Sequence, residues 1–261
     1  MAMPELLTRV RRHELESVQS LFAPGATVLE IGGGNGFQAS IIAGWGCTVH
    51  SFDLAGRPSA ARAYHAVSDY DGVHVPLPDD SIDVAFSSNV LEHVRELPAL
   101  LAETRRVLKP GGIGVHILPT PTWRFWSIVA HYPFLVFTAL HMRTGFVDWS
   151  DKQARQARTS ERGVAYLIKR IMWPGPHGEF SNAVVELSAF RAAYWTQALE
   201  SAGFAVERVT PTGIYYSGYG LFPDLATQTR RRMARLLGSS TQTIVVRKPV
   251  ARASETTGKP A

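Results

Sequence analysis

Cysteine is nearly absent from this sequence, with Cys47 as its single example among 261 residues. One cysteine excludes an internal disulfide framework and any metal site built from several thiolates, and it is compatible with a reducing compartment. Cys47 starts a β-like run, where we expect a small core residue. Charged residues make up 19% and hydrophobic residues 45%, the balance of a globular protein.

Other features are also missing. Residues 1–5 lack the charged-then-apolar pattern of a signal peptide, and the sequence contains no internal repeat. No nucleic-acid-binding appendage is found, so we expect no nucleic-acid partner. We expect a cytoplasmic protein. Its net charge of +5 and pI near 9.5 fit either attraction to anionic surfaces or a solvated basic exterior.

The stretch Val28-Leu-Glu-Ile-Gly-Gly-Gly-Asn-Gly36 organises the first half of the chain. The apolar run Thr27–Ile31 predicts a short buried parallel strand, and Phe37–Ala43 predicts a helix. The glycines between them let the backbone turn sharply and approach a ligand closely. A strand, a glycine turn and a helix N-terminus together form a nucleotide-binding device at the carboxyl edge of a sheet.

Two ligand classes use this device. Residues 34–39 satisfy the loose dinucleotide pattern G-x-G-x-x-A, which is weak evidence because short glycine patterns recur by chance. The fuller pattern Glu30-x-Gly32-x-Gly34-x-Gly36 resembles the first motif of the class I S-adenosylmethionine-dependent methyltransferases. That resemblance implies that Glu30 and the glycine backbone hold the methionine part of the cofactor.

A carboxylate, Asp53, ends the expected second strand, Cys47–Asp53. It lies about twenty residues beyond the glycines, where dinucleotide and S-adenosylmethionine sites alike place a ribose ligand. A carboxylate accepts hydrogen bonds from two hydroxyls at once. Asp53 is therefore a candidate ribose ligand in either class.

The run from Asp71 to Val94 separates the two classes. It contains Val-Pro-Leu-Pro-Asp-Asp-Ser-Ile-Asp and Val-Leu-Glu-His-Val, and it resembles the D-x-x-x-L-P-F-P-D-x-S-F-D…L-E-H-V run of ubiquinone and menaquinone biosynthesis methyltransferases. The resemblance implies that Asp71 contacts the adenine amino group, with Tyr70, in place of a glycine, stacking nearby and Asn89 also in the cofactor site. Dinucleotide dehydrogenases have no such run. We expect S-adenosylmethionine as cofactor and no metal.

The resemblance covers residues 25–118 densely and resumes at 189–210. It implies an α/β fold, a Rossmann-like seven-stranded, mostly parallel sheet with helices on both faces and a helical, aromatic insertion after the fifth strand. We expect an N-terminal helix within 1–24, one domain over 25–247 with insertions at 119–188 and 213–240, and a disordered tail over 248–261. Further helices are expected at Leu97–Leu108 and Trp195–Ala202, and further strands at Val84–Phe86, Ile113–Leu118, Ala205–Thr210 and Thr241–Arg247.

The first insertion contains 18 residues, Phe125–Met142, without Asp, Glu, Lys or Arg. A membrane crossing there would separate the last two strands from the rest of the sheet, so we expect none. Pro133 predicts two short helices with a break. Two alternatives stay open: a hydrophobic lid over the acceptor pocket, or insertion into one membrane leaflet. Two sets of basic residues favour contact with an anionic membrane. Lys152, Arg155, Arg158, Arg162, Lys169 and Arg170 follow the apolar stretch, and Arg230, Arg231, Arg232 and Arg235 share a helix-like segment near the end of the sequence.

The residues at the end of the expected fourth strand narrow the class of acceptor. Ser87-Ser88-Asn89 is not the Asp/Asn-Pro-Pro-aromatic motif of nucleic-acid N-methyltransferases, and no cysteine is placed for cytosine C5 chemistry. We expect O-methylation of an amphiphilic or lipid-linked small molecule. The alternatives are a soluble natural-product or sugar methyltransferase and a non-catalytic S-adenosylmethionine-binding module.

A base for a hydroxyl acceptor is expected in the irregular segment Trp173–Glu179 of the first insertion. Imidazole titrates near neutrality, so His177 is the candidate base, with Glu179 as the group that orients it. His93 is the rival candidate. A surface turn whose histidine has no catalytic role would explain the same residues.

Overall fold

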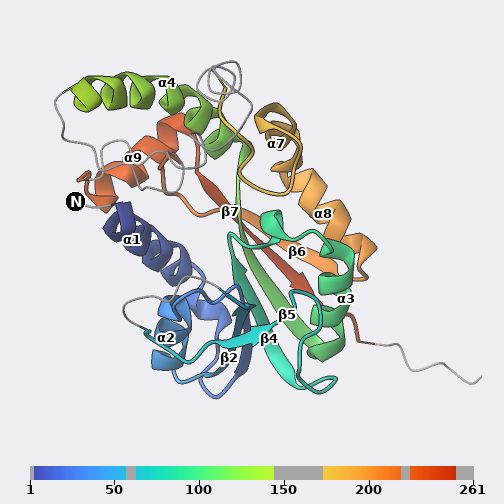
Figure 1. The fold of residues 1–261 in the computed structure, drawn as a ribbon. Coiled ribbons are helices and arrows are strands. Elements are labelled where there is room, and N and C mark those ends of the chain that lie inside the picture. The colour runs from blue at the N-terminus through green and yellow to red at the C-terminus, as the bar shows by residue number, and fades with distance from the viewer. Residues whose placement is uncertain (1–2, 57–62, 144–172, 219–223, 251–261) are drawn as a thin grey trace, which may run out of the picture.

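The computed structural model describes residues 3–56, 63–143, 173–218 and 224–250. Within these ranges seven strands form one sheet in the order β3-β2-β1-β4-β5-β7-β6 (Figure 1). The pairs among β1 to β5 are parallel, whereas β7 is antiparallel to β5 and to β6. This confirms the predicted fold class. The strands are β1 (Thr27–Ile31), β2 (Thr48–Leu54), β3 (Ser68–Tyr70), β4 (Ile82–Ser88), β5 (Leu108–Pro119), β6 (Ala205–Pro211) and β7 (Thr241–Arg247).

Helices cover both faces of this sheet (Figure 1). The described ranges contain the helices α1 (Met3–Glu16), α2 (Phe37–Gly44), α3 (Leu97–Val107), α4 (Pro121–Arg143), α7 (Ala183–Ala189), α8 (Ala192–Ser201) and α9 (Thr227–Leu237), with short 3-10 turns η1 (Gln19–Leu21) and η2 (Leu91–His93). The predicted first helix is therefore shorter than expected, since the α-helix ends at Glu16.

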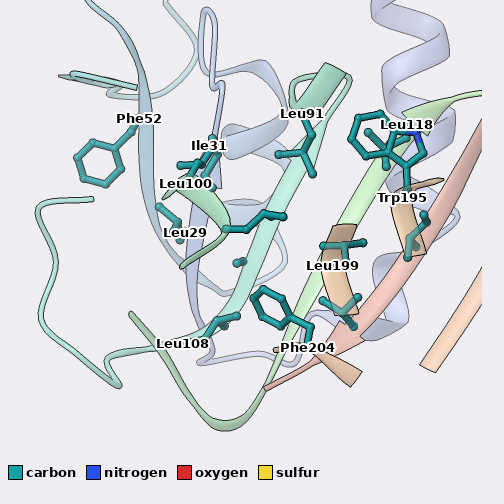
Figure 2. Close-up of a cluster of buried hydrophobic side chains, with 14 of the residues drawn as sticks. Leu29, Ile31, Phe52, Leu91, Leu100, Leu108, Leu118, Trp195, Leu199 and Phe204 are labelled. Atoms are coloured by element: carbon teal, nitrogen blue, oxygen red, sulfur yellow. The ribbon is translucent and has the colours of Figure 1, made fainter. Parts of the chain in front are cut away.

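The central strands are apolar on both faces because each face packs against helices. On one face, Leu29 and Leu118 pack with Leu100 of α3 and Leu199 of α8 (Figure 2). On the other, alternate residues such as Phe86 pack against the end of α1 and against α2. Leu6 and Val10 of α1 belong to the first of these clusters, so α1 is held against the strands that position the site.

The expected break at Pro133 is wrong. α4 is one continuous helix from Pro121 to Arg143 with Pro133 inside it. A proline removes one backbone hydrogen bond, but favourable helical residues on both sides can carry the helix through at a cost of about 3 kcal/mol. Among the described residues, no helix combines the length and apolar character that crossing a membrane requires.

The expected disordered tail begins too early at residue 248. Lys248 continues from β7, donating from Nζ to Asp80 Oδ1 at 2.6 Å and to the carbonyl of Leu108 at 2.7 Å. These contacts fix the end of β7 to the loop before β4 and to the start of β5. The rest of the expected tail, residues 251–261, and the basic residues between 152 and 170 lie outside the described residues.

Candidate functional site

The glycine loop lies at the carboxyl end of β1, as predicted. Gly32, Gly34 and Gly36 all have positive φ angles, 76°, 56° and 75°. The amides of Gly32 and Gly33 donate to the carbonyl of Phe52 at 2.8 and 3.1 Å, which ties the loop to β2. A Cβ on Gly34 would meet no atom within 4 Å, so the loop faces open space where a cofactor can approach its backbone.

Asp53 stands beside this loop at the end of β2. Its Oδ2 accepts from the amide of Gly34 at 2.6 Å, and its Oδ1 accepts from the amide of Leu54 at 2.7 Å. Each carboxylate oxygen has a second lone pair, so the group can still receive two ribose hydroxyls. The glycine loop and the ribose acceptor are thus joined by a hydrogen bond before any cofactor binds.

Glu30 lies underneath the loop and is buried. Its Oε2 accepts from the Ser51 hydroxyl at 2.5 Å. Burial raises the pKa of Glu30 to about 7, while the Ser51 hydrogen bond and the nearby His65 oppose the rise. Gly33, which the sequence interpretation did not include among the site residues, has no room for a side chain, because a Cβ there would lie 2.0 Å from Ser51 Oγ and 2.9 Å from Glu30 Oε2.

Tyr70 is the last residue of β3, and Asp71 follows it at the same edge. The Asp71 carboxylate accepts from the amides of Val73 and His74 and pairs with His74 Nδ1 at 2.6 Å. The His74 hydrogen bond, followed by the two amides, lowers the pKa of Asp71 to about 2. Tyr70 is half-buried against Phe52, with ring centroids 6.1 Å apart. Asp71 is therefore ionised and rigidly held, with His74 as a partner that the sequence did not indicate.

Asn89 adopts the left-handed conformation, with φ of 54°, just after β4. Its amide donates to the carbonyl of Ile117 at 2.8 Å. The turn places the next residue, Val90, over the glycine loop, where its Cγ2 would lie 2.3 Å from a Cβ on Gly32. The predicted cofactor residues Glu30, Gly32, Gly34, Gly36, Asp53, Tyr70, Asp71 and Asn89 thus all lie along the carboxyl ends of β1 to β4 or in the loops after them.

The two histidines considered as rival bases lie together. The ring centroids of His93, in η2, and His177 are 4.8 Å apart, and the His177 ring is 4.6 Å from that of Trp123 in α4. Packing around His177, then its neighbours His93, Arg124 and Arg11, lowers its pKa. Burial also lowers the pKa of His93. Both imidazoles are therefore neutral at pH 7, the form that can accept a proton.

Glu179 does not orient His177, and this part of the prediction is wrong. Glu179 Oε2 instead accepts from Arg95 Nε at 2.8 Å. The backbone around His177 is held by Glu186 of α7, whose Oε1 accepts from the amides of His177 and Gly178 at 2.6 and 2.8 Å. Glu186 is itself buried and paired with Arg124 of α4 at 2.7 Å. No local pattern predicted these partners, because they come from two separate helices.

A buried polar cluster below the histidines also went unpredicted. Glu14 of α1 is fully buried and accepts from Thr241 Oγ1 at 2.6 Å and from Arg11 at 2.7 Å. The hydroxyl of Tyr216 lies 3.5 Å from both Glu14 and Arg11. These contacts fix α1 to the start of β7. Residues of α1, η2, the start of α4 and 173–182 thus lie around the two histidines, and we call this region the acceptor side because the predicted bases lie in it.

Glu92, next to His93, is buried, and among the described residues neither of its carboxylate oxygens accepts a hydrogen bond. Glu92, His93 and His177 each offer a ligand atom, all within 4.8 Å of one another. One carboxylate oxygen and two imidazole nitrogens form a donor set that could hold a divalent cation. The sequence interpretation, which expected no metal, did not bring these three residues together.

Replacing Glu92 by Gln should flatten the pH dependence of stability. Burial, reinforced by Glu14 and Glu186 and opposed by Arg11, raises the pKa of Glu92 to about 8, against an ordinary value of 4.5. The folded state therefore binds this proton more tightly, and the resulting stability is full below about pH 4.5 and lost as pH rises through about 8. At roughly 1.4 kcal/mol per pKa unit, several kcal/mol are at stake.

Urea unfolding of wild type and Glu92→Gln at pH 5 and pH 8.5 measures this difference. Glu96→Gln, at an exposed glutamate nearby, is the matched control and should behave as wild type. Equal pH dependence of the unfolding free energy in wild type and Glu92→Gln would contradict this prediction, because it would mean that ionising the buried carboxyl does not destabilise the fold.

Comparison with known proteins agrees with this geometry. Residues 29–115 match the family described as a methyltransferase domain. The malonyl-acyl-carrier-protein O-methyltransferase of Serratia marcescens is 40% identical over 94 residues, a match spanning 34% of this chain and only 37% of that protein. An S-adenosylmethionine-dependent methyltransferase from Archaeoglobus fulgidus has TM-score 0.55 at 16% identity, covering 92% of this chain and 94% of that one. The cyclase SpnF has TM-score 0.51 at 16% identity, covering 92% and 81%.

Residues 29–115 thus carry a methyltransferase domain, and the fold and glycine loop around it are those of the class I S-adenosylmethionine-dependent methyltransferases. The cofactor is S-adenosylmethionine. The predicted family, cofactor and enzymatic nature are confirmed. The residues present suit that cofactor, with backbone amides and open space at Gly34 for its amino-acid part and Asp53 for its ribose.

Proposed function

We propose that this enzyme transfers the methyl group of S-adenosylmethionine to an oxygen of an amphiphilic or lipid-linked small molecule, working against a membrane surface. The observation that carries the proposal is an apolar stripe on α4. The exposed side chains Phe125, Val129, Tyr132 and Val136 recur at helical spacing on one face, with exposed fractions of 50%, 42%, 41% and 61%. We call these four residues the α4 stripe.

The helix that carries the α4 stripe also reaches the acceptor side of the site. Trp123, in the first turn of α4, contacts the ring of His177 with its own ring. On the same helix, Trp126 donates from Nε1 to the carbonyl of Leu237 at 3.1 Å and fixes α4 to α9. Because Trp123 and the stripe are on opposite faces of α4, the stripe can meet a membrane while the buried face of the helix stays packed beside the histidines. Exposed apolar patches of this kind support contact with a membrane or an apolar partner.

The proposed reaction is an in-line displacement. The acceptor oxygen forms a bond to the methyl carbon as the carbon–sulfur bond breaks. The electron pair of that bond stays on sulfur, and S-adenosylhomocysteine is the leaving group. The sulfonium already activates the methyl group, so the chain mainly supplies alignment, worth roughly 7–11 kcal/mol. We assign the hydroxyl proton to His177, with His93 beside it, because both imidazoles are neutral at pH 7.

The acceptor class is tested by supplying methyl-labelled S-adenosylmethionine with three acceptor pools: a membrane-lipid extract, malonyl thioesters and a panel of sugars and phenols. We expect label in the organic phase with the lipid extract, together with release of S-adenosylhomocysteine. Label only in water-soluble products would favour a soluble natural-product or sugar acceptor. Cofactor binding without release in any pool would favour the non-catalytic binding module.

Removing the α4 stripe should weaken binding to vesicles. Phe125→Ser with Val136→Ser removes two exposed apolar side chains, each worth up to about 1.5–3 kcal/mol if fully buried, so we expect a loss of tenfold or more. The measurement is flotation with vesicles containing anionic lipid, and retention should fall at high salt because screening shortens electrostatic attraction.

The matched control replaces two valines exposed elsewhere, Val209 at 39% and Val250 at 66%, by Ser. This control should float as wild type does. If wild type remains unbound at low salt, the membrane proposal fails and α4 acts only as a wall of the acceptor pocket.

A further inference from the structure

A groove of about 680 Å³ lies between α1 and α9, and no step of the proposed reaction uses it. One wall is the last turn of α1 with His13 and Glu16, and the other is α9 with Arg231 and Arg235. Its floor is formed by the loop after β6 and the residues just before β7. The groove is large enough for a small polar ligand or a lipid headgroup.

The charge of the groove is concentrated on α9. Arg231 and Arg235 are four residues apart, so they lie on the same face of the helix. Both are exposed, and within the described ranges neither guanidinium has an ion pair or a hydrogen bond. Arg230, by contrast, is buried and donates to the carbonyl of Tyr215 at 3.2 Å. In the described part of the chain, two guanidiniums at the mouth of one groove thus have no protein partner.

The opposite wall does not neutralise them. Glu16 is the single acidic residue among those described that line the groove, and it makes no ion pair with either arginine. His13 lies 3.3 Å from the carbonyl of Thr212 through Nε2, so it holds the wall rather than supplying an acceptor. α9 contains no Asp or Glu. The groove therefore carries a net positive charge and favours an anion.

The polar groups on the floor of the groove already form hydrogen bonds with one another. Ser239 Oγ accepts from the amide of Gly213 at 3.0 Å and donates to the carbonyl of Thr241 at 2.7 Å. Recognition consequently falls to the guanidiniums, which form paired hydrogen bonds to phosphate or carboxylate oxygens.

The groove adjoins the surface proposed for the membrane. α9 is fixed to α4 through the bond from Trp126 to Leu237, and Thr120, just before α4, donates from Oγ1 to the carbonyl of Ser239 at 2.6 Å. Next to Arg235, the Leu236 side chain is 86% exposed. Figure 1 shows α4 and α9 together at the end of the molecule that α1 also reaches. Apolar and cationic groups are therefore combined, as at a lipid interface.

We propose that the groove between α1 and α9 binds the phosphate of an anionic lipid headgroup through Arg231 and Arg235, while the α4 stripe enters the acyl region. The inference rests on the membrane contact proposed above. It adds a headgroup site to that contact and makes the interaction selective for anionic lipid.

The test compares the double variant Arg231→Gln with Arg235→Gln against a control of equal net charge, Arg191→Gln with Arg208→Gln. Both control arginines are exposed and do not line the groove. Binding is measured on vesicles of phosphatidylcholine alone and of phosphatidylcholine with phosphatidylglycerol. We expect the groove variant to bind anionic vesicles more weakly, on the order of fivefold per arginine. Its binding to neutral vesicles and its affinity for S-adenosylmethionine should equal those of wild type.

Several results would overturn the inference. One is equal loss in the groove variant and the control, which would mean diffuse charge attraction. Another is saturable binding of inorganic phosphate in the groove by calorimetry together with unchanged vesicle binding, which would mean a soluble phosphate ligand. If wild type binds neither kind of vesicle, the membrane contact fails together with this site. If the Phe125→Ser/Val136→Ser variant loses binding and the groove variant does not, the membrane contact stands and the headgroup site alone is wrong.

Discussion

Asp53→Ala should weaken S-adenosylmethionine binding by about 100-fold or more. Hydrogen bonds to a charged group contribute roughly 1.5–3 kcal/mol each, and Asp53 offers acceptors to two ribose hydroxyls. The change also removes the 2.6 Å bond from the Gly34 amide, which holds the glycine loop against β2. Titration calorimetry measures the affinity, and thermal unfolding shows whether the variant is folded.

Asp79→Asn is the matched control for this experiment. Asp79 lies in the loop before β4, at the amino end of the parallel strands, whereas the glycine loop lies at their carboxyl end. The Asp79 carboxylate pairs with Arg106 of α3. Its replacement should leave cofactor affinity within about twofold of wild type, since surface ion pairs contribute little. An Asp53→Ala variant with wild-type affinity would place the ribose elsewhere in the site.

His177→Gln should lower turnover by roughly 10²–10⁴-fold with cofactor affinity unchanged, if the imidazole takes the acceptor proton. The sign of its pKa shift adds a second readout. Because packing lowers the pKa of His177, the ring stays neutral below pH 6.5, and the acid limb of the wild-type rate profile should lie below that of a free histidine. The measurement is the rate of S-adenosylhomocysteine release against pH.

Two controls distinguish a catalytic base at His177 from a structural or metal-binding role of the same residue. His74→Gln removes a histidine paired with Asp71 on the cofactor side and should keep the acid limb. Treatment with a chelator should leave wild-type turnover intact, whereas a large loss that a divalent cation restores would make Glu92, His93 and His177 metal ligands instead. Wild-type turnover in His177→Gln would leave His93 as the candidate.

The fold could be predicted because the central strands can be recognised from their apolar residues. A parallel strand covered on both faces must be largely apolar, and Val28, Leu29 and Ile31 give Thr27–Ile31 this character. Once the strands are parallel, their carboxyl ends share one edge, so the glycine loop and Asp53 had to meet there. β3 could not be located in the same way, since Ser68–Tyr70 is a three-residue edge strand without an apolar pattern.

The acceptor side was harder to predict because its contacts join distant segments. The sequence predicts that Glu179 orients His177, but the Glu179 carboxylate instead pairs with Arg95. The carboxylate that holds the backbone of His177 belongs to Glu186 in α7. The spacing between these two residues in the sequence matches no known motif, so the contact could not be predicted. Similarly, Glu14 meets Thr241 across more than two hundred residues. The predicted break at Pro133 is wrong for a different reason, because the favourable helical residues on both sides of Pro133 keep α4 continuous.

The most direct measurement is calorimetric titration of the purified wild-type chain with S-adenosylmethionine and, separately, with NAD. The glycine loop and Asp53 predict binding of S-adenosylmethionine in the micromolar range, about −8 kcal/mol, with one site per chain and no measurable binding of NAD. Saturable NAD binding without heat from S-adenosylmethionine would contradict the assignment of the carboxyl edge of β1 and β2 to methyl transfer.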